Sequence, residues 1–276
     1  MQHTRQHPFR DAVGRTSIAG LLLAASMTIP AVAQAQCPIG ATCFFGTDVT
    51  GSASTRATNV NSLVARNAFF GSLSGVGTET FESIISGTSN PSLVFTGAGT
   101  ANLTGGGSVI TQGPGTTVDG RYPVSGTKLY EAISASGGGT TFSIGFTSPV
   151  AAFGFYGIDI GEFSSQLSLL FTLVGGGTQT WALPYVATNG TNTARDGSLL
   201  YAGFINTTGF TKVAFLGTSS DDIFGFDDMT IGSIAQVNPP TPVPVPPTTV
   251  PEPSTVLLLS GGLAAVMVAA RRRRNA

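Results

Sequence analysis

The residues of this chain that could do chemistry are almost all carboxylates. Between Gln36 and Val250 the sequence has twelve acidic and six basic residues, a net charge of −6, and no histidine, because His3 and His7 both precede this part. Without histidine, neither a Ser-His-Asp triad nor a Cys-His pair can form. Zinc and copper sites also lose their usual ligand. The chemistry that remains is that of oxygen ligands and carboxylic acids.

A calcium site is the first chemistry that these carboxylates predict. We expect Glu82 and Asp227 to share one calcium ion, with Asp228 or a backbone carbonyl assisting, because the two acids would meet if the first and last strands pair. Glu82 follows Phe81 and Asp227 follows Phe226, so both carboxylates would be partly desolvated and costly to leave unpaired. No lysine or arginine lies within five residues of either acid. A cation from solution is therefore the expected partner.

Acid catalysis is the second possibility, and the predicted local structure speaks against it. Asp227 and Asp228 are adjacent in a predicted strand, so their side chains should point to opposite faces and cannot form a catalytic pair. We therefore predict a non-enzymatic protein, with a carboxylate-based glycan-active enzyme as the alternative. For Asp221 and Asp222, solvated acids in a turn remain an open interpretation. The sparse, unclustered basic residues do not favour a nucleic-acid partner.

The chain has two cysteines, Cys37 and Cys43. In an exported protein they predict a disulfide that closes a small loop and holds the N-terminal edge of the fold. A reactive thiol pair is the alternative. It has little support, since the nearest charged residue, Asp48, has the wrong sign to lower a thiol pKa.

The elements that must position these residues are mostly strands. One helix is expected near the start, capped by Ser54 or Thr55 and ending by Gly71, with Val60, Leu63, Val64 and Ala68 on one face. Beyond it, apolar and polar residues alternate, as in Phe142, Ile144 and Phe146. The predicted strands cover residues 141–146, 150–158, 167–174, 178–183, 199–205, 210–216 and 223–231. Their spacing predicts a mainly β fold, an antiparallel β-sandwich over residues 36–237.

Both ends of the chain read as export signals. Residues 1–35 have three arginines, an apolar stretch and small residues before Gln34 and Gln36, which is typical of a cleaved signal peptide used by the secretion translocon. A permanent N-terminal anchor is the alternative. Residues 238–250 are rich in proline and predict a stiff polyproline II spacer, with a proline-rich recognition ligand as the alternative.

Residues 251–276 combine a Pro-Glu-Pro motif, an apolar run and a basic cluster. The predicted transmembrane helix covers 255–270, of which the 15 uncharged residues from Val256 to Ala270 would rise only about 22 Å against a ~30 Å hydrocarbon core. Four arginines resist translocation and should stay cytoplasmic. The residues that form this pattern are Pro251, Glu252, Pro253, Arg271, Arg272, Arg273 and Arg274.

This tail resembles the PEP-CTERM protein-sorting signal. The resemblance implies a Gram-negative host, recognition by a membrane-embedded exosortase, and removal of the helix after transient anchoring in the inner membrane. The mature protein would then lie at the cell surface or outside the cell. An ordinary C-terminal anchor is the alternative.

Three segments of the body resemble the β-sandwich ectodomains that often precede such tails: residues 80–82, 148–155 and 222–230. Many jelly-roll carbohydrate-binding modules show a similar early Phe-Glu and late Asp-Asp, with a structural calcium between the first and last strands. The resemblance implies a jelly-roll-like domain associated with exopolysaccharide in a biofilm. A purely structural biofilm component is the first alternative. An ice-binding adhesin is another, although the paired threonines show no repeat period.

Overall fold

The structure is a computed structural model that describes residues 36–113, 117–185, 187, 195–238 and 271. The predicted signal peptide, nearly all of the proline-rich segment and the sorting signal lie outside these described residues. Within the described part, no helix has both the length and the apolar character that a membrane span requires.

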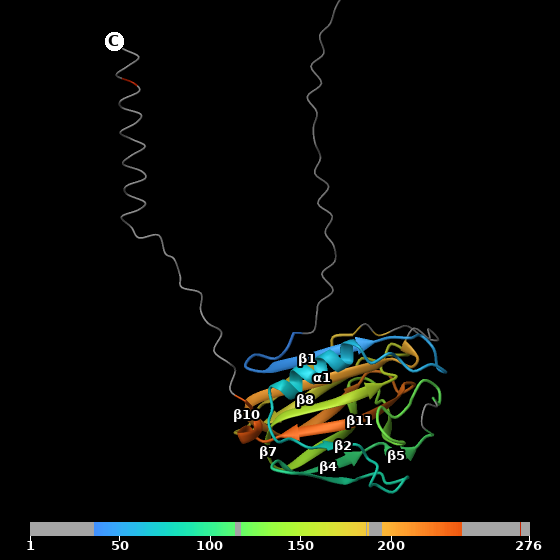
Figure 1. Cartoon of the computed structure of the whole chain (residues 1–276), viewed down its shortest axis with the longest axis horizontal. Coiled ribbons are helices and arrows are strands. Elements are labelled where there is room, and N and C mark those ends of the chain that lie inside the picture. Colours follow the sequence, from blue (N-terminus) through green and yellow to red (C-terminus); the bar gives the residue numbers. More distant parts are fainter. Residues whose placement is uncertain (1–35, 114–116, 186, 188–194, 239–270, 272–276) are drawn as a thin grey trace, which may run out of the picture. The chain divides into compact units, whose positions relative to one another are not determined.

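Eleven strands form one antiparallel system, accompanied by a single α-helix and a 3-10 turn among the described residues (Figure 1). In chain order the elements are β1 (Thr42–Asp48), α1 (Asn61–Gly71), β2 (Thr78–Glu79), β3 (Ser92–Phe95), β4 (Gly99–Gly105), β5 (Ser108–Thr111), β6 (Lys128–Ile133), β7 (Gly139–Ile158), β8 (Ser168–Leu173), β9 (Thr178–Ala182), β10 (Leu199–Gly217), β11 (Ile223–Gly232) and η2 (Ile234–Gln236).

Two long strands, β7 and β10, pair with each other along nearly their whole length and take part in two layers. The early half of β7 and the late half of β10 lie between β4 and β8, while their other halves lie between β11 and β1. Register shifts between Ile205 and Lys212 mark the change of layer. Each long strand therefore unites two of the predicted strands, and the predicted antiparallel sandwich is confirmed.

The core between the layers is built largely from phenylalanine. Phe142 and Phe215 stack with ring centroids 4.2 Å apart, and Phe155 and Phe226 pack at 5.2 Å. All four are fully buried, as the alternation along the strands predicts for Phe142. Burial of each such ring contributes about 1.5–3 kcal/mol. The core fixes the positions of the strand ends, from which the polar loops leave.

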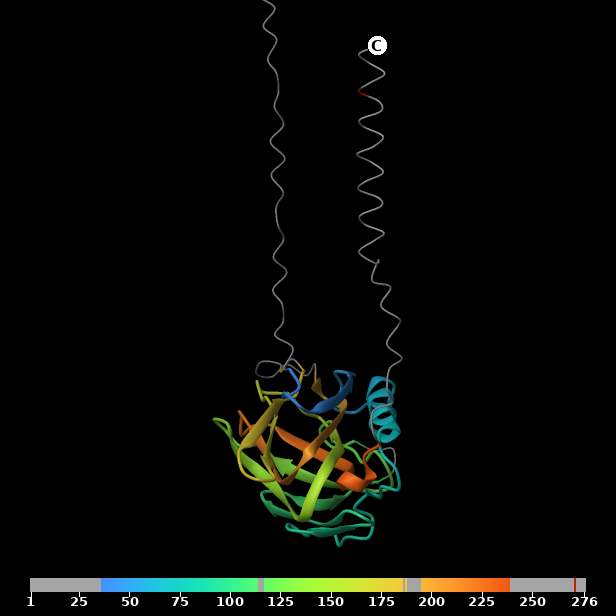
Figure 2. The same cartoon turned by 90° about the vertical axis from the view of Figure 1, so that its left-hand side faces the viewer.

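The helix α1 lies on the outer face of one layer (Figure 2) and begins later than predicted. Its cap is Asp48 at the end of β1, and not Ser54 or Thr55. The Asp48 carboxylate accepts hydrogen bonds from the N–H groups of Val60, Asn61 and Ser62 at 3.2, 2.9 and 2.9 Å. The predicted cap was wrong because an acid distant in sequence reaches the free N–H groups of the first turn.

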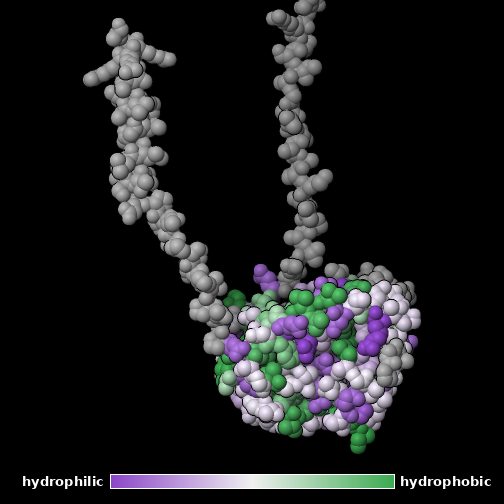
Figure 3. Space-filling model, viewed as in Figure 1, coloured by the Kyte–Doolittle hydropathy of each residue, from purple (hydrophilic) through white to green (hydrophobic). Residues whose placement is uncertain are grey.

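The buried face of α1 also differs from the prediction. Ala65 and Phe69 are buried, whereas Val64 is 67% exposed and Leu63 39% exposed. Phe69 sets the rotation of the helix, because its ring packs against Phe44 of β1 at 5.6 Å and against a buried tyrosine of β10. Figure 3 shows apolar surface over the region of α1 and β1, consistent with the exposed valine and leucine.

Both ends of the described domain are fastened to it. The predicted disulfide between Cys37 and Cys43 is present and ties the first residues to the edge strand β1. At the other end, the Gln236 amide donates to the carbonyl oxygens of Gly75 and Thr96 at 2.6 and 3.2 Å. Asn238, where the predicted spacer starts, donates to the carbonyl oxygens of Ser72 and Leu73 at 2.9 and 3.1 Å.

Candidate functional site

Three strand ends converge at one end of the sandwich and bring distant acids together. Leu199, the first residue of β10, pairs with Ile158, the last of β7, and Gly225 near the start of β11 also pairs with Ile158. Because β7 runs antiparallel to β10 and β11, it ends at the edge of the sheet where they begin. The loop after β7 therefore lies beside the segments that precede β10 and β11. Asp159, Asp196 and Asp222 occupy these three segments.

Asp159 is the most constrained of these acids. Its side chain is 1% exposed, and its backbone has a φ of 63°, in the left-handed region. One carboxylate oxygen, Oδ1, accepts a hydrogen bond from the Gly197 N–H at 2.8 Å, and the other, Oδ2, lies 3.6 Å from the Arg121 guanidinium. Gly120 approaches so closely that a Cβ there would overlap the carboxylate. The Gly197 N–H, the Arg121 guanidinium and the close approach of Gly120 therefore hold the Asp159 carboxylate in the interior.

Two further acids share a single point with Asp159. One oxygen each from Asp159, Glu162 and Asp196 lies within 4.8 Å of the others. The Glu162 and Asp196 carboxyl groups lie close enough to share a hydrogen bond when Glu162 is protonated. The loop that carries Glu162 has positive φ at Gly161 and Phe163, which folds it tightly back over the end of β7. This tight loop holds Glu162 close to Asp159, and Asp196 approaches them from the segment before β10.

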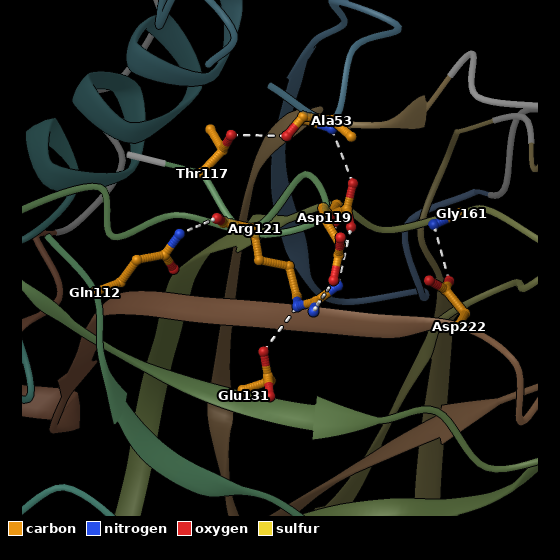
Figure 4. A network of polar contacts seen from close by, with 10 residues as sticks. Ala53, Gln112, Thr117, Asp119, Arg121, Glu131, Gly161 and Asp222 are labelled. Carbon is orange, nitrogen blue, oxygen red and sulfur yellow. Dashed lines mark hydrogen bonds and ion pairs between the residues drawn. The ribbon is translucent and has the colours of Figure 1, made fainter. Parts of the chain in front are cut away.

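Asp222 adds a fourth carboxylate and is completely buried. Its Oδ2 accepts a hydrogen bond from the Gly161 N–H at 3.2 Å, and the Ser165 hydroxyl and the Glu162 N–H also interact with the carboxylate, whereas its Oδ1 is buried and makes no hydrogen bond of ordinary geometry. Figure 4 shows this carboxylate pointing toward Gly161 and the side of the network that holds Arg121. Of the two aspartates before β11, Asp221 is exposed, but the interpretation of Asp222 as a solvated acid was wrong. It precedes a strand that enters the core.

Arg121 supplies positive charge at the edge of this group. Its guanidinium lies 2.7 Å from Glu131, 3.6 Å from Asp159 and 3.7 Å from Asp119 (Figure 4). The 2.7 Å contact to Glu131 is a charge-assisted hydrogen bond, and the two longer contacts are weaker. The guanidinium also donates to the Asp119 carbonyl oxygen at 3.1 Å, so among the described residues its two hydrogen bonds go to Glu131 and Asp119 and not to an acid of the group.

The electrostatic cost of the group appears in its pKa values. Burial raises the pKa of Asp159 to about 7, and the N–H of Gly197 and the charge of Arg121 only partly oppose this. Burial likewise raises the pKa of Asp222 to about 7. Burial, the hydrogen bond to Asp196 and the neighbouring negative charges raise the pKa of Glu162 to about 9. At neutral pH Glu162 therefore holds a proton, and Asp159 and Asp222 are each about half protonated, unless a cation binds the group.

A surface pocket of about 280 Å³ opens onto the group, and Glu162, Asp196 and Asp221 line it. Oxygens bound to one calcium ion at about 2.3–2.6 Å lie at most roughly 5 Å apart. One oxygen from each of Asp159, Glu162 and Asp196 lies within 4.8 Å of the others, so the group can share one cation.

The three acids predicted to bind calcium are elsewhere, around the segment that precedes β6. Glu82 is exposed, and its Oε1 accepts hydrogen bonds from the N–H groups of Thr127 and Lys128, both at 2.7 Å. Lys128 also donates its ammonium group to the Glu82 carbonyl oxygen at 2.9 Å. A cationic side chain thus lies beside Glu82 although none is near it in sequence.

Asp227 and Asp228 bind this same segment. Asp227 is fully buried, and its Oδ2 accepts from the N–H groups of Val124 and Ser125 at 2.7 and 3.0 Å. Asp228 accepts from the Ser125 hydroxyl at 2.6 Å. The prediction that the two side chains point to opposite faces was wrong, because β11 has a register shift after Asp227 and Asp228 has a φ of 50°. The assignment of calcium to these acids stays a prediction.

The acids that the structure does bring together carry a faint signal in the sequence. Asp159 and Glu162 directly follow an apolar strand, and Asp196 stands three residues before the next long apolar run. Knowledge that these strands are antiparallel neighbours would have placed the acids at one edge. The positions of these acids in the sequence did not by themselves indicate that they lie together.

Comparison with known proteins gives one family match. Residues 249–274 match the model described as the PEP-CTERM protein-sorting motif, which confirms the resemblance drawn from the Pro-Glu-Pro motif, the apolar run and the arginines. No curated protein matches the chain.

Several solved structures resemble the chain weakly. The K2 cleaved adhesin domain of Lys-gingipain is 16% identical over 57% of this chain and 97% of that domain, with a TM-score of 0.34. The C-terminal family 22 carbohydrate-binding module of Clostridium thermocellum Xyn10B is 12% identical over 59% and 95%, with a TM-score of 0.30. TmCBM61, solved with β-1,4-galactotriose, is 13% identical over 48% and 88%, with a TM-score of 0.26. At these TM-scores the likenesses assign neither a ligand nor a site.

Proposed function

We propose that this protein is an exported, exosortase-sorted component of the cell surface or extracellular matrix, whose β-sandwich associates with exopolysaccharide without catalysis. The observation that carries the proposal is the match of residues 249–274 to the PEP-CTERM protein-sorting motif. A disulfide between Cys37 and Cys43 is in keeping with an oxidising compartment.

The charge of the domain narrows the kind of polysaccharide. Residues 36–250 carry a net charge of −6, so they repel polyanionic glycans at low salt. We therefore propose a neutral polysaccharide as the partner. A second candidate function is that of a structural biofilm component without a specific sugar site. The same sorting motif supports it, and it differs from the first function in that no glycan is bound.

Processing is the first test. Intact-mass measurement of protein released by an exosortase-bearing host should give a species that lacks residues 1–35 and the tail from about Pro251 onward. The matched control replaces Pro251, Glu252 and Pro253 with alanine, which should leave the tail in place. A wild-type product that still ends at Ala276 would contradict sorting and indicate an ordinary anchor.

Glycan binding is the second test. The released protein should be retained by neutral extracellular polysaccharide from its host and not by an acidic polysaccharide of similar length at low salt. Retention by neither glycan would reject the binding role and support the structural one. Equal retention by both would contradict the electrostatic argument.

A further inference from the structure

We propose that the acids at the end of β7 form a binding site for one calcium ion, held by Asp159, Glu162 and Asp196 with the free oxygen of Asp222. This site is distinct from the one predicted at Glu82 and Asp227. It lies in different loops, after β7 and before β10 and β11.

Geometry is the first support for the site. One oxygen from each of Asp159, Glu162 and Asp196 lies within 4.8 Å of the other two, as the ligands of a single calcium ion must. Asp159 and Glu162 come from one tightly folded loop, while Asp196 comes from another segment. An ion would therefore add a link between the loop after β7 and the segment before β10, which the Asp159 carboxylate and the Gly197 N–H already join.

The orphaned oxygen of Asp222 is independent support. A buried carboxylate oxygen without a partner is costly, and such atoms are rare in folded proteins. Asp222 accepts a hydrogen bond from the N–H of Gly161, the residue before Glu162, and it precedes β11, whose Gly225 pairs with Ile158 beside Asp159. A cation at the group would satisfy this oxygen, directly or through a bound water.

Charge balance and access agree with this. Four carboxylates would carry four negative charges, and Arg121 directs its shortest contact to Glu131. A divalent cation would offset half of the charge of the acids and remove the need for protons on them. The pocket lined by Glu162 and Asp196 gives the ion a path from solution. An all-carboxylate, partly buried set of irregular geometry suits calcium better than magnesium, which keeps its waters and requires a near-octahedral shell.

The test uses purified exported protein and calcium chloride. Isothermal titration should show one ion bound per chain. Saturating calcium should raise the unfolding midpoint by about 5–10 °C relative to excess chelator, whereas magnesium at the same concentration should raise it much less. Absence of both binding and a shift would overturn the proposal.

Variants locate the ion. Asp196→Asn and Glu162→Gln should each weaken calcium binding at least about tenfold and reduce the thermal shift; Asp196 is only partly buried, so its variant should fold. Asp221→Asn is the matched control, since Asp221 lines the same pocket but is exposed and outside the group, and it should bind normally. Glu82→Gln should also bind normally. Binding that survives in Asp196→Asn but is lost in Glu82→Gln would overturn this site in favour of the other.

Discussion

Asp48 and Glu162 are both carboxylates with little exposed surface, yet they meet opposite kinds of neighbour. Asp48 faces three backbone N–H groups at the start of α1, and Glu162 faces other carboxyl groups. Burial alone would raise the pKa of Asp48, but hydrogen bonds from the side chain and backbone of Ser62 and from the backbones of Asn61 and Val60 outweigh it and lower the pKa. The pKa of Glu162 moves the other way, to about 9.

The comparison distinguishes carboxylates that stabilise the fold by accepting hydrogen bonds from carboxylates that we propose bind a cation. A carboxylate surrounded by N–H donors contributes stability in its charged form. A carboxylate surrounded by carboxylates costs stability in its charged form, and the fold tolerates it only with a proton or a cation. Charge count alone does not distinguish the two, but the identity of the neighbouring atoms does.

The largest expected effect is on the pH dependence of stability in chelator. Unfolded carboxyl groups titrate near pH 4, whereas Asp159 and Asp222 titrate at about 7 and Glu162 at about 9 in the folded protein. Between pH 5 and 9 the folded state therefore binds more protons, so the free energy of unfolding should fall as pH rises, by up to about 1.4 kcal/mol per pH unit for each acid that keeps its proton only in the folded state. Urea unfolding at pH 5, 7 and 9 measures it.

Calcium sharpens this test. With saturating calcium the acids stay charged at all these pH values, and the decline should flatten. Asp48 provides the opposite sign, because its stabilisation is complete above pH 4 and is lost only as pH falls below that value. A stability that rises from pH 5 to 9 in chelator would contradict the comparison.

The next effect concerns the acid that holds the helix. Asp48→Ala should lower the free energy of unfolding by about 3 kcal/mol, because it leaves the N–H groups of Val60, Asn61 and Ser62 without their acceptor. Ser54→Ala is the control and should cost less than about 0.5 kcal/mol, since Ser54 is exposed and does not cap α1. Equal losses of unfolding free energy in the two variants would contradict the assignment of Asp48, and not Ser54, as the cap of α1.

The smallest effect has the opposite direction. In chelator at pH 8, Glu162→Gln should raise the free energy of unfolding by about 1–2 kcal/mol, because the amide mimics the protonated acid and removes the cost of taking up a proton on folding at that pH. At pH 4.5 the same change should be nearly neutral, and in saturating calcium it should be destabilising. A loss of stability in chelator at pH 8 would show that Glu162 holds the fold as Asp48 does.

The strands were largely predictable because their signal is local. Alternation at Phe142 and Ile144 and the apolar run before Val174 identify β7 and β8 from neighbouring residues alone. Sequence analysis placed two separate strands at 141–146 and 150–158, with Pro149 between them. The structure accommodates it as a continuation of β7, since a strand that changes layer can bend there. Sequence analysis did not assign the shorter strands β1 to β6, of which β4 is rich in glycine and threonine and β2 has only two residues.

The site was not predictable because it depends on which strands are neighbours. Asp159 and Asp196 are far apart in the sequence, and only the pairing of Ile158 with Leu199 brings them together. The argument that no cationic side chain lies near Glu82 failed for the same reason, because Lys128 at the start of β6 donates a hydrogen bond to the Glu82 carbonyl oxygen. Adjacent Asp227 and Asp228 misled for a different reason: a left-handed residue cancels the alternation on which the strand argument rests.

The fastening of Asn238 and Gln236 has a mechanical consequence. A pulling force that enters the domain from the C-terminal side acts first on the hydrogen bonds of Asn238 to Ser72 and Leu73, then on those of Gln236 to Gly75 and Thr96. Only after these yield does the load reach β11, which is paired with β6 on one side and β7 on the other. We therefore expect these hydrogen bonds to break before the sheet does under load. They can re-form after a brief pull, while the phenylalanine core stays intact.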